Sequence, residues 1–331
     1  MAGRRRKKSG GRSYAWRYRG RIVACVFVEV IIICALVIMI GWNKGVKEWF
    51  EQFEQPVLKE VDISGINSPN AILMQARGGK ILGEINGEAQ IYPASMTKIM
   101  TVILGIENFD DLDEKITLTN EMFTGLYEQD ATQAGFQPGE EVRVIDLLYG
   151  AMLPSGAECC IALADTISGS EADFAELMNK KAAKLGMENT HFCDSTGLHN
   201  PDHYSTVKDI AVLMKYCIKN DTFREIVETS RHSTGVTNIH PDGITYYSTM
   251  FKNLSDPTVT GGKILGGKTG YTSEAGHCLV SFAEIEGREY IFVSAGASGA
   301  DGNTIPHIQD AVTVYNRVGA AIEEKMNDNN K

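Results

Sequence analysis

The sequence predicts an α+β fold in which an antiparallel sheet is flanked by helices and a separate all-helical lobe is inserted into the chain. Three observations lead to this prediction. A hairpin pattern opens the globular part, a block of helical patterns follows, and strand patterns with one closing helix end it. We expect the first hairpin and the last strands to share one sheet, with the first and last helices of the globular part packed on it.

The opening hairpin is predicted over residues 71–87, where the apolar stretches AILMQA and ILGEING flank the turn RGGK. A helix is predicted to start near Ser95 in IYPASMTKIMTVILGIENF. The serine precedes apolar residues at positions 96, 99, 100, 103, 104 and 106. This spacing places the apolar side chains on one face of a helix, which can then be buried.

The helical block follows two short strand patterns. The helices are recognised by their apolar period, and the last of them is closed by Gly186. We predict strands over 114–119 and 140–144 and helices over 145–153, 157–168 and 171–185.

Residues 190–205, THFCDSTGLHNPDHYS, show no period and many turn formers, so we expect a long surface loop. The next helix begins with Thr206 and Asp209 placed as a capping box. The chain then becomes rich in strand patterns. We predict strands over 233–239, 243–251, 276–285 and 289–297 and a closing helix over 306–326.

The apolar run from Ile22 to Trp42 predicts a transmembrane anchor. Its 21 residues would form a helix about 32 Å long, against a hydrocarbon core of roughly 30 Å. Residues 1–44 carry ten Lys or Arg residues and one acid, Glu29, which predicts a cytoplasmic N-terminus. A cleaved signal peptide and a buried helix of a soluble domain are the alternatives, although the apolar region of a signal peptide is usually only about 7–15 residues. Glu29 either leans toward the cytoplasmic face or meets a polar group on a partner helix.

The chain is therefore predicted to have five parts. Residues 45–331 hold 22 basic and 41 acidic residues, a formal net charge of −19, so we expect no binding of nucleic acid. We expect a basic cytoplasmic tail over residues 1–21, the anchor over 22–42, a stalk over 43–60, the globular domain over 61–322 and a polar tail over 323–331.

The cysteines predict neither a disulfide framework nor a metal site. Five lie outside the anchor, an odd number without framework spacing, and there is no C-x-x-C pair or histidine cluster. We expect these five thiols to be mostly buried, and we expect no metal or other cofactor.

Three short motifs follow one another along the chain. They are Ser95-Met96-Thr97-Lys98 at the predicted helix start, Ser155-Gly156-Ala157 between two helices, and Lys268-Thr269-Gly270 before a strand. Each motif is weak alone, and Ser95 could be an ordinary N-cap with a solvated lysine one turn on. Their joint occurrence, in this order, favours a serine nucleophile.

The first motif has the parts of an activated nucleophile. Ser95 and Lys98 share one face of a helix, so the amine can reach the hydroxyl. An unperturbed lysine would be protonated, but burial and the cation Lys268 would lower its pKa and let it accept a proton. We expect Ser155 to relay a proton to the leaving amine.

The third motif has the parts of a substrate cradle. The N–H of Ser95 and an N–H at about Tyr271 could together hold an oxyanion. Gly270 lets a substrate approach the strand closely, while Lys268 and Thr269 offer a cation and a hydroxyl to a terminal carboxylate. His203 and His277 lie near suggestive motifs, but we expect them to be structural.

These motifs and the segments YPASMTK, LPSGAECCIALAD, DSTGLHNPDHYST and GGKTGYTSEAGH resemble serine-type D-alanyl-D-alanine carboxypeptidases, the low-molecular-mass penicillin-binding proteins. The resemblance covers roughly residues 61–320. It implies a β-lactamase/transpeptidase-like fold. Together with the predicted anchor over 22–42, we expect a single-pass membrane protein whose peptidase domain faces the wall. The resemblance also implies removal of the last D-Ala from peptidoglycan pentapeptide stems through an acyl-enzyme on Ser95, which β-lactam antibiotics would trap.

The sequence departs from this family at two positions. Ala157 stands where the family usually has Asn, and Lys252 in MFKNLSD is the nearest match to an arginine expected to bind the substrate carboxylate. Lysine keeps the charge but loses the bidentate geometry. Ala157 keeps open a non-catalytic, wall-binding scaffold. A β-lactamase is disfavoured, because no E-x-x-x-N stretch lies between Ser155 and Lys268.

Overall fold

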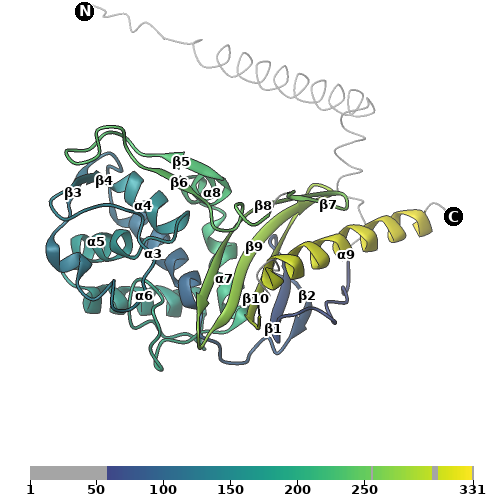
Figure 1. The fold of residues 1–331 in the computed structure, drawn as a ribbon. Helices are drawn as coiled ribbons and strands as arrows, with labels where there is room; N and C mark the ends of the chain where they lie inside the picture. Colours follow the sequence, from purple (N-terminus) through teal and green to yellow (C-terminus); the bar gives the residue numbers. More distant parts are fainter. Residues whose placement is uncertain (1–57, 255, 300–304, 330–331) are drawn as a thin grey trace, which may run out of the picture. The chain divides into compact units, whose positions relative to one another are not determined.

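The central sheet joins the beginning and the end of the globular part. The structure is a computed structural model and describes residues 58–254, 256–299 and 305–329. Neighbouring strands of the sheet pair antiparallel, and β1 runs against β10 from Asn70↔Ala295 to Gln75↔Tyr290. The first hairpin and the last strands therefore share one sheet, as predicted (Figure 1). The strand order is β2 (Ile81–Ile85), β1 (Asn70–Gln75), β10 (Arg288–Ala297), β9 (Gly276–Ile285), β8 (Gly262–Thr272) and β7 (Thr258–Val259).

Both faces of this sheet are buried. Successive side chains of a strand point to opposite faces, so Ile72 joins the core cluster that contains the residues of α7 (Val207–Cys217), and Leu73 joins the one that contains α9 (Pro306–Asn329). Figure 1 shows α7 and α9 on the two sides of the sheet. Helix α9 extends beyond its predicted end at Met326.

The helical lobe lies between β2 and β7 in the chain, as predicted. Its first helix, α3, packs on the other helices. The face of the sheet that we expected this helix to cover is occupied by α7, together with the short 3₁₀ helix η1 (Ala94–Thr97), which contacts β8 and β9. The helices of the lobe are α3 (Lys98–Asn108), α4 (Val144–Met152), α5 (Ala157–Ser168), α6 (Glu171–Leu185) and α8 (Asp221–Glu228).

Two small sheets complete the lobe. Strands β3 (Lys115–Thr117) and β4 (Glu141–Arg143) pair as one, near their predicted positions. The strand predicted over 233–239 was misplaced, because it shares only Ser233 with the observed β5 (Arg231–Ser233). The strand predicted over 243–251 is reduced to β6 (Thr245–Tyr247), which pairs with β5 outside the main sheet. A second 3₁₀ helix, η2, spans Asn120–Phe123.

The prediction of a surface loop over residues 190–205 was wrong. Ser195, Thr196, His203 and Ser205 are buried, and isolated bridges join His191 to Tyr204 and Ile91 to Ser205. The turn-forming residues were recognised correctly. Their polar side chains, however, form hydrogen bonds inside the molecule rather than to solvent.

Four of the five cysteines outside the predicted anchor are buried, and Cys193 is partly exposed, in line with the prediction of mostly buried thiols. Burial raises the pKa of the Cys160 and Cys278 thiols to about 12. A thiol is nucleophilic only as the thiolate, so these side chains behave as small apolar residues.

The basic tail, the anchor over 22–42 with Glu29, and most of the stalk lie outside the described residues. In the part of the chain that the structure describes, none of the helices combines the length and hydrophobicity needed to cross a bilayer. Residues Val57–Lys331 form one compact unit.

Candidate active site

Ser95 lies in η1, immediately before α3, where its side chain meets that of Lys98. The Lys98 Nζ and Ser95 Oγ atoms are 2.9 Å apart. Ser95 is not the N-cap of either helix: Pro93 caps η1 and Thr97 caps α3, both without a side-chain cap bond. Ala94, before the serine, has φ +46°, in the left-handed region that is costly for a residue with a Cβ. The serine is therefore presented on a strained turn, with the lysine beside it.

Lys98 is the first residue of α3 and only 3% exposed. Its Nζ also donates a hydrogen bond to the backbone oxygen of Thr196, at 2.6 Å. Burial lowers the pKa of Lys98 from its ordinary value, while the nearby Cys160, Asp194 and Glu158 act in the opposite direction. This environment favours the neutral amine that a general base requires.

Ser155 lies between α4 and α5 and is also in the left-handed region, at φ +73°. Its Oγ is buried and has no hydrogen-bond partner among the described residues. Glu158, in the first turn of α5, binds a neighbouring loop: its Oε1 accepts from the backbone N–H groups of Ala134 (2.6 Å) and Gly135 (2.9 Å). An unpaired buried hydroxyl on a strained residue is available to a substrate.

Lys268, Thr269 and Gly270 lie within β8 rather than before a strand. The Lys268 Nζ donates to the Thr269 oxygen at 2.9 Å, and the hydroxyls of Thr269 and Thr249 are 2.7 Å apart. Burial, and then the charge of Lys98, lower the pKa of Lys268. A Cβ on Gly270 would lie 3.0 Å from the Ser95 nitrogen, so this glycine allows the strand to approach the nucleophile closely.

One cleft of about 370 Å³ brings most of the predicted residues together. Lys98 and Lys268 are buried and do not line it, and Lys252 is exposed and does not line it either. The lining residues are Ser95, Asp130, Thr132, Pro154, Ser155, Thr249, Asn253, Thr269, Gly270, Tyr271, His277, Ile305 and His307.

Sequence reasoning missed several of these lining residues. Thr249 and Asn253 precede β7, and His307 begins α9, so only the fold brings them to the cleft. The rings of His277 and His307 stack with centroids 5.0 Å apart. Burial, with the neighbouring His277, lowers the pKa of His307 to about 4. No local sequence motif identifies Thr249, Asn253 or His307 as lining residues.

The arrangement has the parts required for acyl transfer by a serine. It contains a nucleophile with an adjacent amine, a free hydroxyl across the cleft, and a strand edge next to the nucleophile. No group of three or more His, Cys, Asp or Glu side chains placed to hold a metal ion occurs within residues 58–254, 256–299 and 305–329.

Comparison with known families supports this description. The family model of D-alanyl-D-alanine carboxypeptidase, peptidase S11, matches residues 57–299. The D-alanyl-D-alanine carboxypeptidase DacF of Bacillus subtilis is 35% identical over 233 residues, covering 69% of this chain and 57% of DacF. The D-alanyl-D-alanine carboxypeptidase of Streptomyces sp. (strain K15) is 35% identical over 236 residues, which cover 69% of this chain and 78% of that protein.

Solved structures are also similar to this chain. The crystal structure of the Streptomyces K15 DD-transpeptidase matches with a TM-score of 0.69 and 30% identity, covering 79% of this chain and 100% of that one. This likeness confirms the predicted transpeptidase-like fold. The chain spans only 57% of the length of DacF and 58% of the length of Escherichia coli DacC.

Proposed function

The chain belongs to the peptidase S11 family of D-alanyl-D-alanine carboxypeptidases, and on this premise we propose that it removes the terminal D-Ala from peptidoglycan stem peptides. The observation that carries the proposal is the 2.9 Å hydrogen bond between Lys98 Nζ and Ser95 Oγ beside the cleft. A serine hydroxyl is a weak nucleophile unless a base lies this close to it.

In the proposed reaction, neutral Lys98 takes the hydroxyl proton of Ser95 while Oγ attacks the carbonyl carbon of the penultimate D-Ala. The C–N bond to the terminal D-Ala then breaks, and the leaving amine receives a proton through the Ser155 hydroxyl. Water hydrolyses the resulting ester and regenerates Ser95. Backbone N–H groups at Ser95 and Tyr271 would stabilise the oxyanion, each by about 10²–10³ in rate.

The terminal carboxylate of the substrate is best placed at β8. The hydroxyls of Thr269 and Thr249 lie together on the cleft wall, and the buried amine of Lys268 donates to the backbone oxygen of Thr269. Lys252 remains a prediction from sequence. Its exposed position outside the cleft lining makes it the weaker candidate.

Intact mass spectrometry of the full-length chain after incubation with benzylpenicillin tests the nucleophile. We expect one covalent adduct on the native protein and none on a folded Ser95→Ala variant. Release of D-Ala from an acyl-D-Ala-D-Ala peptide tests the reaction. An adduct that forms equally on Ser95→Ala would contradict the assignment of Ser95.

A catalytically inactive, wall-binding scaffold is the second candidate, because Ala157 offers the cleft no polar side chain. The same assays separate the two functions. A folded chain that forms the penicillin adduct but releases no D-Ala would favour the scaffold.

We also propose that residues 22–42 anchor the protein in the cell membrane, with the N-terminus in the cytoplasm and the peptidase domain facing the wall. The 21-residue apolar run and the ten basic residues around it support this placement. Protease treatment of intact, wall-stripped cells should degrade the domain and spare the N-terminal tail. Release of the whole chain by alkaline carbonate would contradict an anchor.

A further inference from the structure

Lys98 has a hydrogen-bond partner that lies outside the three motifs. Besides Ser95 Oγ, its Nζ contacts the backbone oxygen of Thr196 at 2.6 Å. A neutral amine has two hydrogens and one lone pair, so the hydrogen given to Thr196 helps to determine where the lone pair points. Ala157, the first residue of α5, has no side-chain acceptor that could do the same.

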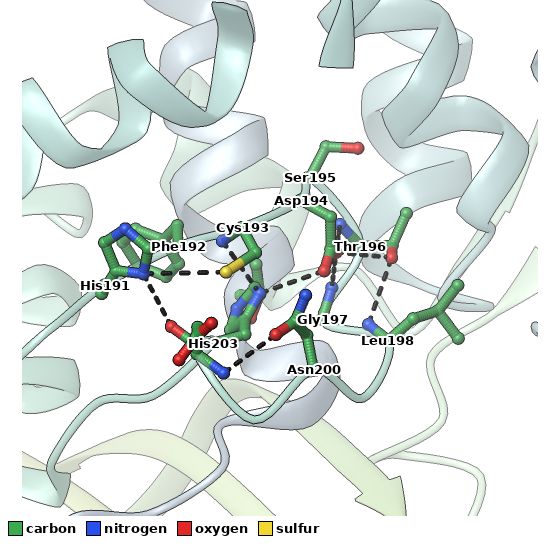
Figure 2. A network of polar contacts seen from close by, with 12 residues as sticks. His191, Phe192, Cys193, Asp194, Ser195, Thr196, Gly197, Leu198, Asn200 and His203 are labelled. Atoms are coloured by element: carbon green, nitrogen blue, oxygen red, sulfur yellow. Dashed lines mark hydrogen bonds and ion pairs between the residues drawn. The ribbon is translucent and has the colours of Figure 1, made fainter. Parts of the chain in front are cut away.

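The turn that carries this oxygen is shaped by Asp194. Its Oδ1 accepts from the N–H of Thr196 (2.8 Å), the hydroxyl of Thr196 (2.7 Å) and the N–H of Gly197 (2.7 Å). Figure 2 shows these bonds converging on one carboxylate. Burial would raise the pKa of Asp194, but hydrogen bonds from His203 and Thr196 hold it at about 2, so the carboxylate stays charged.

His203 connects this turn to the nucleophile helix. It is 2% exposed, and its Nδ1 lies 3.0 Å from Asp194 Oδ2 (Figure 2). Its Nε2 lies 2.9 Å from the hydroxyl of Thr97, which directly precedes Lys98. Nδ1 also lies 3.3 Å from the Cys193 nitrogen. The Nε2–Thr97 contact can be a hydrogen bond with the ring nitrogen as either donor or acceptor, because a hydroxyl group can both donate and accept.

The turn also packs directly on the nucleophile segment. Gly197 has φ +80°, and a Cβ there would lie 1.9 Å from the Ala94 oxygen. Behind it, the Thr101 hydroxyl donates to the Ser195 oxygen at 2.6 Å. The contacts with Thr97, Lys98 and Thr101 therefore fix this turn against the first turn of α3.

We propose that His203 is a positioning residue, which together with Asp194 and Thr97 holds the Thr196 oxygen on Lys98 so that the amine faces Ser95. The inference rests on the proposed function, because it concerns activation of the same nucleophile. A misplacement of about 1 Å in such a group can cost roughly 10²-fold in rate.

The test is the acylation of the full-length chain by a fluorescent penicillin, followed over penicillin concentration. For His203→Ala we expect a limiting acylation rate about 10²-fold lower, with little change in the concentration for half-maximal rate. The His203→Asn variant keeps a donor at the position of Nδ1 and should recover part of the rate. The matched control is His191→Asn: it lies in the same loop but contacts Asp202, not α3, and should leave the rate unchanged.

A double-mutant cycle with Thr97→Val separates positioning from general damage. Both substitutions remove the same contact, so the double variant should be no slower than the slower single variant. Thr97→Val also serves as the test if His203→Ala does not fold, because it leaves the Asp194–His203 contact in place.

Two results would overturn the inference while leaving the proposed function intact. In the first, the native chain is acylated and the His203→Ala variant is acylated equally fast. In the second, the rate losses of the two single substitutions simply multiply in the double variant. A folded native chain that forms no acyl-enzyme would overturn the proposed function, and this inference with it.

Discussion

Lys98 and Lys268 are both nearly inaccessible to water, at 3% and 1% exposure, and burial lowers the pKa of each. Removing a charged amine from water costs free energy, and only hydrogen bonds or opposite charges inside the protein can compensate for this cost. The Lys98 Nζ contacts one hydroxyl and one carbonyl oxygen. The residues best placed for the chemistry are thus among the least favourable for folding.

Lys98→Met should abolish acylation but leave the domain as stable as the native protein, or more stable by about 1–3 kcal/mol. Where native Lys98 is neutral and the unfolded lysine is protonated, the unfolded chain binds more protons, so native stability rises with pH. That rise should be smaller in Lys98→Met. Urea denaturation at several pH values measures it, with the exposed Lys219→Met as the control; a clear loss of stability in Lys98→Met alone would contradict the expectation.

Gly197→Ala should destabilise the domain more than Gly169→Ala, by about 1–3 kcal/mol. Both glycines have positive φ, +80° and +83°, so the backbone penalty is shared. Only at Gly197 would the new methyl group meet backbone, whereas nothing lies within 4 Å at Gly169. Chemical denaturation compares the two variants. Equal losses would mean that the turn can move away from Ala94.

At the scale of elements, β8 carries the third motif and, like the two-residue β7, is a strand that was not among the predicted ones. Its run GKILGGKTGYT contains four glycines, which weaken the strand signal. Besides Gly270, the structure explains two more of them. A Cβ on Gly266 would lie 2.4 Å from the Val227 oxygen of α8, and one on Gly267 would lie 2.4 Å from the Val280 oxygen of β9.

Local patterns predicted the flanking hairpin, most helices of the lobe and the three motifs, because period and capping are properties of neighbouring residues. They could not predict contacts between distant segments. The contact of His203 with Thr97 spans 106 positions, and the cleft wall that includes Thr249 and His307 depends on where the segment before β7 and the start of α9 come to lie. The turn-rich composition of residues 190–205 gave no sign of their burial.

Helix α9 is joined to the sheet by a polar contact as well as by its apolar face. The buried Tyr315 hydroxyl lies 3.1 Å from Ser281 Oγ, and it accepts from the Phe292 N–H, also at 3.1 Å. Tyr315→Phe should lower the free energy of unfolding by about 1–3 kcal/mol, because a buried backbone donor loses its partner. Urea denaturation measures this, beside Tyr127→Phe, whose side chain is 86% exposed and should be neutral. Equal stabilities would show that the hydroxyl is dispensable.

At the scale of the whole molecule, the cleft lies where the helical lobe, the sheet and the start of α9 meet, so its walls come from all three. His307 occupies this junction, stacked on His277 and with Asp310 on its own helix as the nearby carboxylate. Its buried Nδ1 has no partner among the described residues. Protonating this ring would place a charge at the point where the three parts join.

The domain should therefore lose stability in acid. The pKa of His307 is about 4 in the folded domain, against 6.5 for an ordinary histidine, so between these values the unfolded chain binds the extra proton. The free energy of unfolding should fall as pH drops through this window, by on the order of 3 kcal/mol. Urea denaturation from pH 7 to pH 4 measures the fall, and His307→Gln should reduce it. An unchanged pH dependence in that variant would remove His307 from the explanation.

The buried thiols can report local opening of the native domain. Cys159 and Cys160 lie in α5, Cys217 in α7 and Cys278 in β9, so the helical lobe, the helix on one face of the sheet and the sheet itself each contain at least one buried alkylatable group. A maleimide can reach each of them only when that part opens, whereas the partly exposed Cys193 supplies a reference within the same chain. The order in which these four sites become labelled would reveal which part of the domain opens first in the native state.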